Sequence, residues 1–222
     1  MEPTPRLRIG KLILVPALVS LCITFLRLAG ELRDWSPTWF SKETSGPIPT
    51  GFSWVIGITW LALPFGAWFA WKLGEAGIKP ARPGRALVLA LVSTALFYSL
   101  PDLLFSVTPL SFPLSLLPIW AGSLIAVFVA WYAWPALAKV LAAYGLAARL
   151  PVALVMFLAM HGKWGTHYDY TGMPAQFQMP FWKGFFWLAF FPQLIFWVGY
   201  TVMIGVVAGS LVSVIRGRLR LT

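Results

Sequence analysis

The chain has 222 residues, of which 59% are hydrophobic and only 11% are charged, and its mean hydropathy is +0.78. Soluble domains hold about 45–50% apolar and roughly 25% charged residues, so this composition excludes a water-soluble protein and makes lipid the expected solvent. The net charge of +10 does not predict a nucleic-acid partner, because the basic residues stand at the ends of apolar runs, as in membrane proteins. We expect one all-α transmembrane domain over residues 1–222.

Apolar runs of about 20 residues, the length that crosses a bilayer, predict a six-span helical bundle. In chain order the spans are expected at residues 11–32, 52–76, 85–106, 116–144, 147–162 and 181–215. The first run resembles a signal peptide, but it continues past Cys22 and has Leu21 where a cleavage site needs a small residue. We therefore interpret it as the first helix. The absence of asparagine and the many Ala, Leu and Arg residues favour a prokaryotic inner membrane.

Basic residues divide unequally between the two sides of this predicted bundle. One side has four, and the other has twelve: Arg6, Arg8, Lys11, Lys72, Lys79, Arg82, Arg85, Lys139, Arg149, Arg216, Arg218 and Arg220. Short cytoplasmic loops are enriched in Lys and Arg. The sequence therefore predicts a multi-pass protein with both its N- and C-termini in the cytoplasm.

The stretch from Ser99 to Pro118 is too apolar for an ordinary water-exposed loop, and it contains four prolines, which prevent a continuous helix. We interpret it as a hairpin on the outer membrane surface. A re-entrant element lining a cavity is the alternative, because irregular backbone at membrane depth needs protein or water around it.

A weak internal similarity, at an offset of 63 residues, suggests a repeated helical hairpin, a plan common in transporters. It places three tryptophans at comparable positions of the second, fourth and sixth predicted helices: Trp71, Trp134 and Trp197. The same helices carry small residues four apart, which allow close helix packing in lipid: Gly66, Ala70 and Gly74; Gly122, Ala126 and Ala130; Gly205, Gly209 and Ser213. Coincidence in a chain rich in Ala, Leu and Trp is the alternative.

Charged residues within the apolar runs are the first candidates for function, because charge inside a bilayer is costly. Arg27 lies about one turn from the outer end of the first helix, with Glu31 four residues later on the same face, and Asp102 is expected at a similar depth. A pair of Arg27 with Glu31 or Asp102 would tie helices together. A ligand site on Arg27, or an arginine reaching to the membrane surface, are the alternatives.

The densest polar segment runs from His161 to Tyr170 and contains both histidines of the chain. His161, His167 and Asp169 together offer the ligand types that bind a divalent metal, or an acid and a base near neutral pH. Their spacing matches no specific metal motif. Anchoring of Trp164 and its aromatic neighbours at the membrane interface is the alternative.

The helix interiors contain scattered hydroxyl groups and one amide, Gln193, beside Pro192. No phosphate-binding loop or nucleophile elbow is present, which disfavours an enzyme, and the sequence requires no cofactor. We expect a small permease or carrier for an apolar or lipid-like solute, with an outward-opening cavity bounded by Arg27, Asp102, Gln193 and the 163–180 loop that holds Trp164 and His167. Two alternatives stay open: a non-catalytic subunit bound to a membrane-protein partner or in a homo-oligomer, and a membrane enzyme using the His161–Asp169 loop.

Overall fold

The computed structural model describes residues 8–43, 51–107, 110–170 and 178–219. Within these ranges every regular element is helical. The main helices, in chain order, are α1 (Ile9–Leu32), α2 (Ala62–Glu75), α3 (Pro83–Val107), α4 (Leu117–Ala133), α5 (Pro135–Gly162), α6 (Phe181–Gly184) and α7 (Val198–Leu219). Single turns η1 (Thr59–Leu61), η2 (Leu114–Leu116) and η3 (His167–Asp169) lie between them, and two π-helical segments, η5 (Phe185–Phe190) and η6 (Pro192–Trp197), join α6 to α7.

Five helical segments in the described residues are long and apolar enough to cross a membrane: Ile9–Leu32, Pro83–Val107, Leu114–Ala133, Pro135–Gly162 and Phe181–Leu219. The prediction of an all-helical bundle with membrane-type helices is thus confirmed. The second predicted span differs, because α2 has only 14 residues. At about 1.5 Å per residue it is roughly 21 Å long, which is less than the ~30 Å of a bilayer core.

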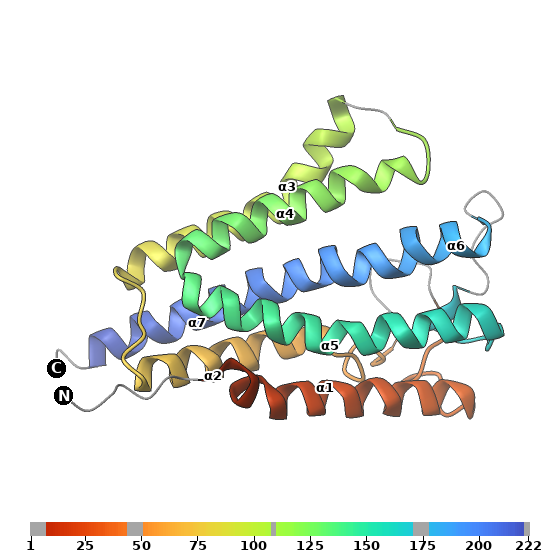
Figure 1. Ribbon diagram of the computed structural model, residues 1–222, viewed down its shortest axis with the longest axis horizontal. Helices are drawn as coiled ribbons and strands as arrows, with labels where there is room; N and C mark the ends of the chain where they lie inside the picture. The colour runs from red at the N-terminus through yellow and green to blue at the C-terminus, as the bar shows by residue number, and fades with distance from the viewer. Residues whose placement is uncertain (1–7, 44–50, 108–109, 171–177, 220–222) are drawn as a thin grey trace.

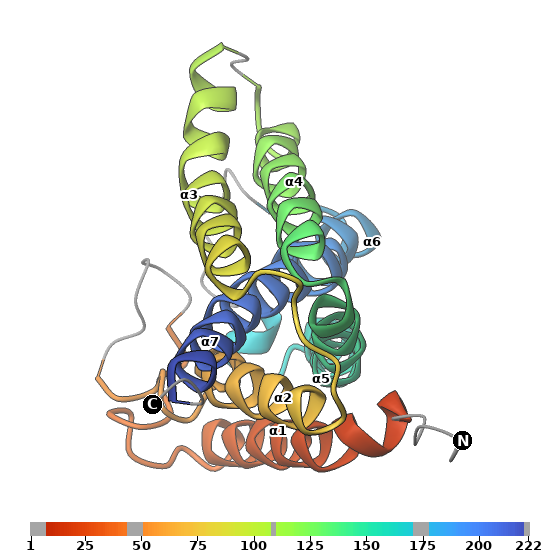
Figure 2. The same ribbon diagram turned by 90° about the vertical axis from the view of Figure 1, so that its left-hand side faces the viewer.

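The helices run side by side along the longest axis of the molecule (Figure 1). α1 begins and α7 finishes at the same end, which we name the terminal end; α5 finishes and α6 begins at the opposite end, named the distal end. Seen from the terminal end, α1 and α2 form one layer, α5 and α7 the next, and the α3–α4 hairpin the last (Figure 2). α7 is therefore the central helix.

Small residues let α2 and α7 approach closely. A Cβ atom added to Gly66 would lie 2.4 Å from the Cα atom of Gly205, and one added to Gly209 would lie 2.8 Å from the Cβ atom of Ala70. Contacts this short exclude larger side chains. The small-residue pattern of the sequence thus marks a real helix contact, although the three tryptophans of the suggested repeat do not occupy equivalent places: Trp71 is exposed on α2, whereas Trp134 lies buried between α4 and α5.

The break between the fourth and fifth predicted helices was placed wrongly. It lies at Trp134, whose backbone leaves helical geometry at φ −153° and ψ 86°, and Pro135 then begins α5, a position that suits proline because its missing N–H is not needed there. Residues 145–146, where the sequence analysis placed the break, lie inside α5. Gly145 marks a close contact instead, since an added Cβ atom would lie 3.3 Å from Val198.

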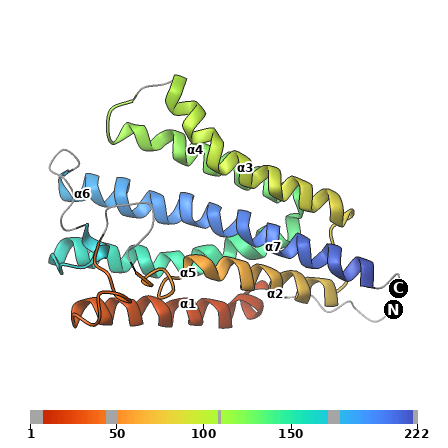
Figure 3. The ribbon, with the colours of Figure 1, turned by 180° about the vertical axis from the view of Figure 1, so that it is seen from behind.

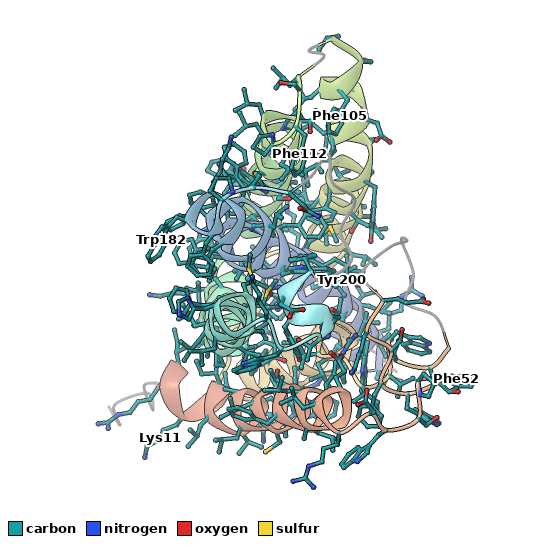
Figure 4. All side chains as sticks on the ribbon, turned by 90° about the vertical axis from the view of Figure 1, so that its right-hand side faces the viewer. Lys11, Phe52, Phe105, Phe112, Trp182 and Tyr200 are labelled. Carbon is teal, nitrogen blue, oxygen red and sulfur yellow. The ribbon has the colours of Figure 1, made fainter. Side chains whose placement is uncertain are left out.

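The described residues of the 99–118 stretch, 99–107 and 110–118, lie toward the tip of the α3–α4 hairpin, away from the other helices at the distal end (Figure 4, where Phe105 and Phe112 are labelled). α3 continues through Pro101 to Val107. The proline ring lies against Gly122 of α4, where an added Cβ atom would be 3.1 Å away. The two helices therefore stay paired at the point where the proline interrupts helical hydrogen bonding.

The segment before α2 enters the bundle without forming a long helix. Residues 51–58 make turns and bends, and only η1 is helical before α2 begins. Figure 3 shows this segment in orange between α1 and α5, in line with α2. Irregular backbone within a bundle of apolar helices lies against protein or lines a cavity, and residues 56–59 line a pocket.

Candidate functional site

A pocket of about 420 Å³ lies where α1, the 54–59 segment, α5, the η3 turn and η6 meet. Its polar lining includes Arg27, Thr59, Arg149, His167 and Gln193. Val152, Met156, Ile58, Trp54 and Trp197 supply apolar and aromatic surface. A concave site with apolar walls and a few polar groups is the usual form of a small-molecule site, and its volume lies within the range of about 300–1,000 Å³ typical of such sites.

One wall of the pocket is a buried cluster centred on Glu31, whose side chain is 0% exposed. Its carboxylate accepts a hydrogen bond from Arg27 Nε at 2.9 Å and another from the backbone N–H of His167 at 3.0 Å. Nδ1 of His167 lies 2.6 and 2.7 Å from the two carboxylate oxygens. The cluster therefore neutralises Arg27 and fixes the η3 turn on the end of α1.

The η3 turn is held by a reciprocal cap at its N-terminal end. Thr166 accepts a hydrogen bond from the N–H of Tyr168, while the Asp169 carboxylate accepts from the backbone N–H groups of Gly165 at 2.7 Å and Thr166 at 3.1 Å. This reciprocal arrangement is a capping box. It explains why a glycine-containing loop holds His167 in one place; the η3 turn, in cyan, lies near the centre of the view from the distal end (Figure 4).

The imidazole of His167 faces the Glu31 carboxylate through Nδ1. Burial lowers the pKa of this imidazole below the usual range, and the hydrogen bond to Glu31 only partly opposes this effect. In the neutral ring the proton belongs on Nδ1, which leaves Nε2 as an acceptor.

The opposite wall carries Arg149, at the middle of α5 and only 5% exposed. Its Nη1 donates to Gln193 Oε1 at 3.4 Å, and its Nη2 donates to Thr59 Oγ1 at 3.2 Å. The guanidinium also lies over the ring of Trp197, with Cζ 4.8 Å from the ring centroid. Two separate segments of the chain, η1 and η6, therefore hold this charge at the pocket.

The π-helical segment η6 brings two of these partners to Arg149. Gln193 and Trp197 both belong to Pro192–Trp197, and Gln193 Nε2 also lies 3.4 Å from the sulfur of Met156. The wider turn of a π-helix changes which face a helix presents, and such segments are frequent at functional sites. Pro192 at the start of η6 is consistent with the break in regular hydrogen bonding.

The two arginines of the pocket differ in their charge balance. Arg27 has Glu31 as a counter-ion, whereas no carboxylate lies within 4.0 Å of Arg149 in the part of the chain that the structure describes. Glu43 also lines the pocket but is exposed. Among the described residues, Arg149 is therefore a buried cation with no carboxylate in contact with it.

The structure brings together three of the five predicted ligand-binding residues: Arg27, Gln193 and His167. Asp102 is exposed on α3 and does not line the pocket. Trp164 is also outside it, with its indole against Gly162 at the end of α5. The observed pocket therefore differs from the expected cavity, because α5 forms one of its walls and α3 does not.

The three predicted metal ligands lie in different surroundings. His161 stacks on Phe157 and meets Phe181 edge-on, His167 contacts Glu31, and Asp169 caps the η3 turn. Among the described residues no group of three or more His, Cys, Asp or Glu side chains is placed to hold a metal ion. Of the three residues, His167 is the one that lines the pocket.

Arg149 was misplaced, because it was expected near the inner end of the fifth predicted span, 147–162. The signal in the sequence was Pro135, which favours the start of a helix. Between residues 136 and 161, only Gly145 and Pro151 favour a turn or break. Reading 135–162 as one helix would have put Arg149 at its centre, where a charge is a functional candidate.

Comparison of the chain with models of known protein families, with curated proteins and with solved structures gives no match. The site geometry alone therefore carries the functional argument.

Proposed function

We propose that the protein is a small carrier or permease of a cell membrane, in which the pocket between α1, α5 and η6 binds the transported solute. The observation that carries this proposal is the pocket itself: about 420 Å³ of space, lined by Arg149 and by an irregular backbone segment inside a bundle of apolar helices. A bundle that served only as a scaffold would gain stability by filling such a space with side chains. Binding sites beside broken helices near the bilayer midplane are typical of transporters.

The proposal includes six crossings of a prokaryotic inner membrane. The five long helical segments supply five of them, and α2 together with the irregular segment before it supplies the sixth. An even number agrees with the start of α1 and the finish of α7 at one end of the bundle (Figure 1). Most basic residues stand near that terminal end, so we place both termini in the cytoplasm and the pocket toward the outer side.

Single-cysteine labelling tests this orientation. Cys22 is replaced by serine, and one cysteine is then introduced, either as Ser36→Cys between α1 and α2 or as Gly217→Cys near the end of α7. A membrane-impermeant maleimide should label Ser36→Cys in intact cells and Gly217→Cys only after permeabilisation. The reverse pattern would overturn the orientation, while leaving the pocket in place.

Transport is tested in proteoliposomes with a panel of labelled small aromatic and alkyl solutes. Val152→Trp should block the pocket, because Val152 is 6% exposed and lines it. Leu154→Trp is the matched control, since Leu154 lies on the same helix but is 60% exposed on its outer side. We expect uptake of at least one solute by the wild type and the control, and its loss in Val152→Trp. Equal uptake by all three proteins, or none by any, would refute the carrier.

A further inference from the structure

We infer that the pocket binds an organic monoanion, with its anionic group on Arg149 and its apolar body against Val152, Met156 and Trp197. This inference rests on the proposed solute pocket and names the class of solute. It is argued from the hydrogen-bond donors of Arg149, its missing counter-ion, its depth in the bundle and the nature of the pocket walls.

Arg149 retains unused hydrogen-bond donors. A guanidinium has five N–H groups in a planar fork and no acceptor. Two of them are used, by Gln193 and Thr59, and no other described side chain or carbonyl accepts from the group. Both of these bonds are long, at 3.4 and 3.2 Å. The group is therefore held in place while part of its fork stays available, a geometry suited to a carboxylate or a similar anion.

The missing counter-ion makes an anion the favoured ligand. An arginine stays charged in proteins, and a buried charge without a partner costs several kcal/mol. Arg149 stands at the middle of a 28-residue apolar helix, where water is scarce. An anionic group in the pocket would remove this cost, whereas a neutral solute would leave it and a cation would increase it. Arg27 does not compete strongly, because Glu31 already neutralises it.

The walls favour an organic anion over an inorganic one. Around Arg149 the pocket is lined by Val152, Met156 and Ile58, and by the ring of Trp197. Chloride or inorganic phosphate would occupy a small part of the 420 Å³ and would leave these surfaces in contact with water. An apolar body of moderate size would cover them, and each buried CH₂ contributes about 0.8 kcal/mol.

The test is equilibrium binding to the full-length protein in phosphatidylcholine nanodiscs, measured by isothermal titration calorimetry. Three matched probes differ only in their polar group: 4-phenylbutyrate, 4-phenylbutanol and 4-phenylbutylamine. Chloride and inorganic phosphate are titrated separately. The variants are Arg149→Gln, Arg149→Lys and, as a control on the exposed side of the same helix, Lys139→Gln.

For the wild type we expect phenylbutyrate to bind at least about tenfold more tightly than phenylbutanol, and the amine to bind most weakly, because hydrogen bonds to charged groups are worth about 1.5–3 kcal/mol. Arg149→Gln should weaken phenylbutyrate binding by about 10- to 100-fold and leave the alcohol within about threefold. Arg149→Lys should retain part of the preference, and Lys139→Gln all of it. The wild-type probe series stands even where a variant fails to fold.

Each opposite outcome has its own meaning. Equal binding of acid and alcohol that is lost in Val152→Trp would overturn the anion inference but keep the solute pocket. Inorganic phosphate binding as tightly as phenylbutyrate would overturn the organic ligand. An acid preference retained in Arg149→Gln would exclude Arg149 as the anchor. Acid-selective binding without uptake in proteoliposomes would support this inference while the carrier function falls.

Discussion

Replacement of Glu31 by alanine should be the most destabilising single change at the pocket. Glu31 is fully buried and accepts hydrogen bonds from Arg27, from the backbone of His167 and from the His167 ring. Its loss would leave an arginine without its counter-ion and two N–H groups without an acceptor. The damage would also be non-local, because these bonds join residues 136 positions apart.

The size of the effect follows from how much water the freed groups can reach. Removing one partner of a buried ion pair typically costs about 3–5 kcal/mol. The side chains of Arg27 and His167 are 12% and 22% exposed, so both recover some solvation, and we expect about 3 kcal/mol for Glu31→Ala. Glu31→Gln keeps one acceptor oxygen but no charge, and about half that loss is expected.

The free energy of unfolding is measurable by titration with SDS in mixed micelles, followed by tryptophan fluorescence. Glu75→Ala is the matched control, because Glu75 is also paired with a cation, Lys72, at 2.9 Å, but lies on the surface. Exposed pairs contribute little, so this change should have no measurable effect. An equally small effect of Glu31→Ala would refute the view that the buried cluster holds the η3 turn on α1.

Three further predictions concern packing, pH and capping. Gly66→Ala should lower the free energy of unfolding by about 1–3 kcal/mol, because the new methyl group would clash with the backbone of α7 at Gly205. Gly10→Ala should not destabilise the protein, because nothing lies within 4 Å of its added methyl group. SDS titration measures both variants. Because burial lowers the pKa of His167, the unfolded chain binds the proton more tightly than the folded protein does. The free energy of unfolding should therefore be unchanged above pH ~6.5 and fall as the pH drops below it. His167→Gln should remove this pH dependence, and His161→Gln should keep it. Thr166→Ala should lower the free energy of local opening of the η3 turn by about 1 kcal/mol, and the amide groups of this turn should then exchange their hydrogens faster.

The parts of the fold that are local in sequence could be predicted, and the non-local parts could not. Hydropathy alone indicated the long helices, and the four-residue spacing of Arg27 and Glu31 already placed them on one face. The acceptor of His167, in contrast, comes from a segment 136 positions away. No periodicity in a single chain contains that information.

The position of the break before α5 determines how Arg149 is interpreted. Residues 145–146 were interpreted as a break between two helices, which put Arg149 near the inner end of a span, where a basic residue supports an orientation and nothing more. In the structure Gly145 lies against Val198 of α7, and the helix continues and carries Arg149 to its midpoint. Without Arg149, eleven basic residues still stand against four, so the expected orientation of the termini is unchanged.

The contrast between the two arginines supports the proposal that Arg149, and not Arg27, anchors the solute. Arg27 received its counter-ion from its own helix, one turn away, and together they recruit the η3 turn. Arg149 has neutral partners from η1 and η6, 90 and 44 positions distant, and an aromatic ring below it. Neutral partners orient a charge without cancelling it. The proposed site would have to regain a stable state after its ligand leaves. The amide, hydroxyl and indole groups around Arg149 supply that state, and they leave its charge available to the proposed solute.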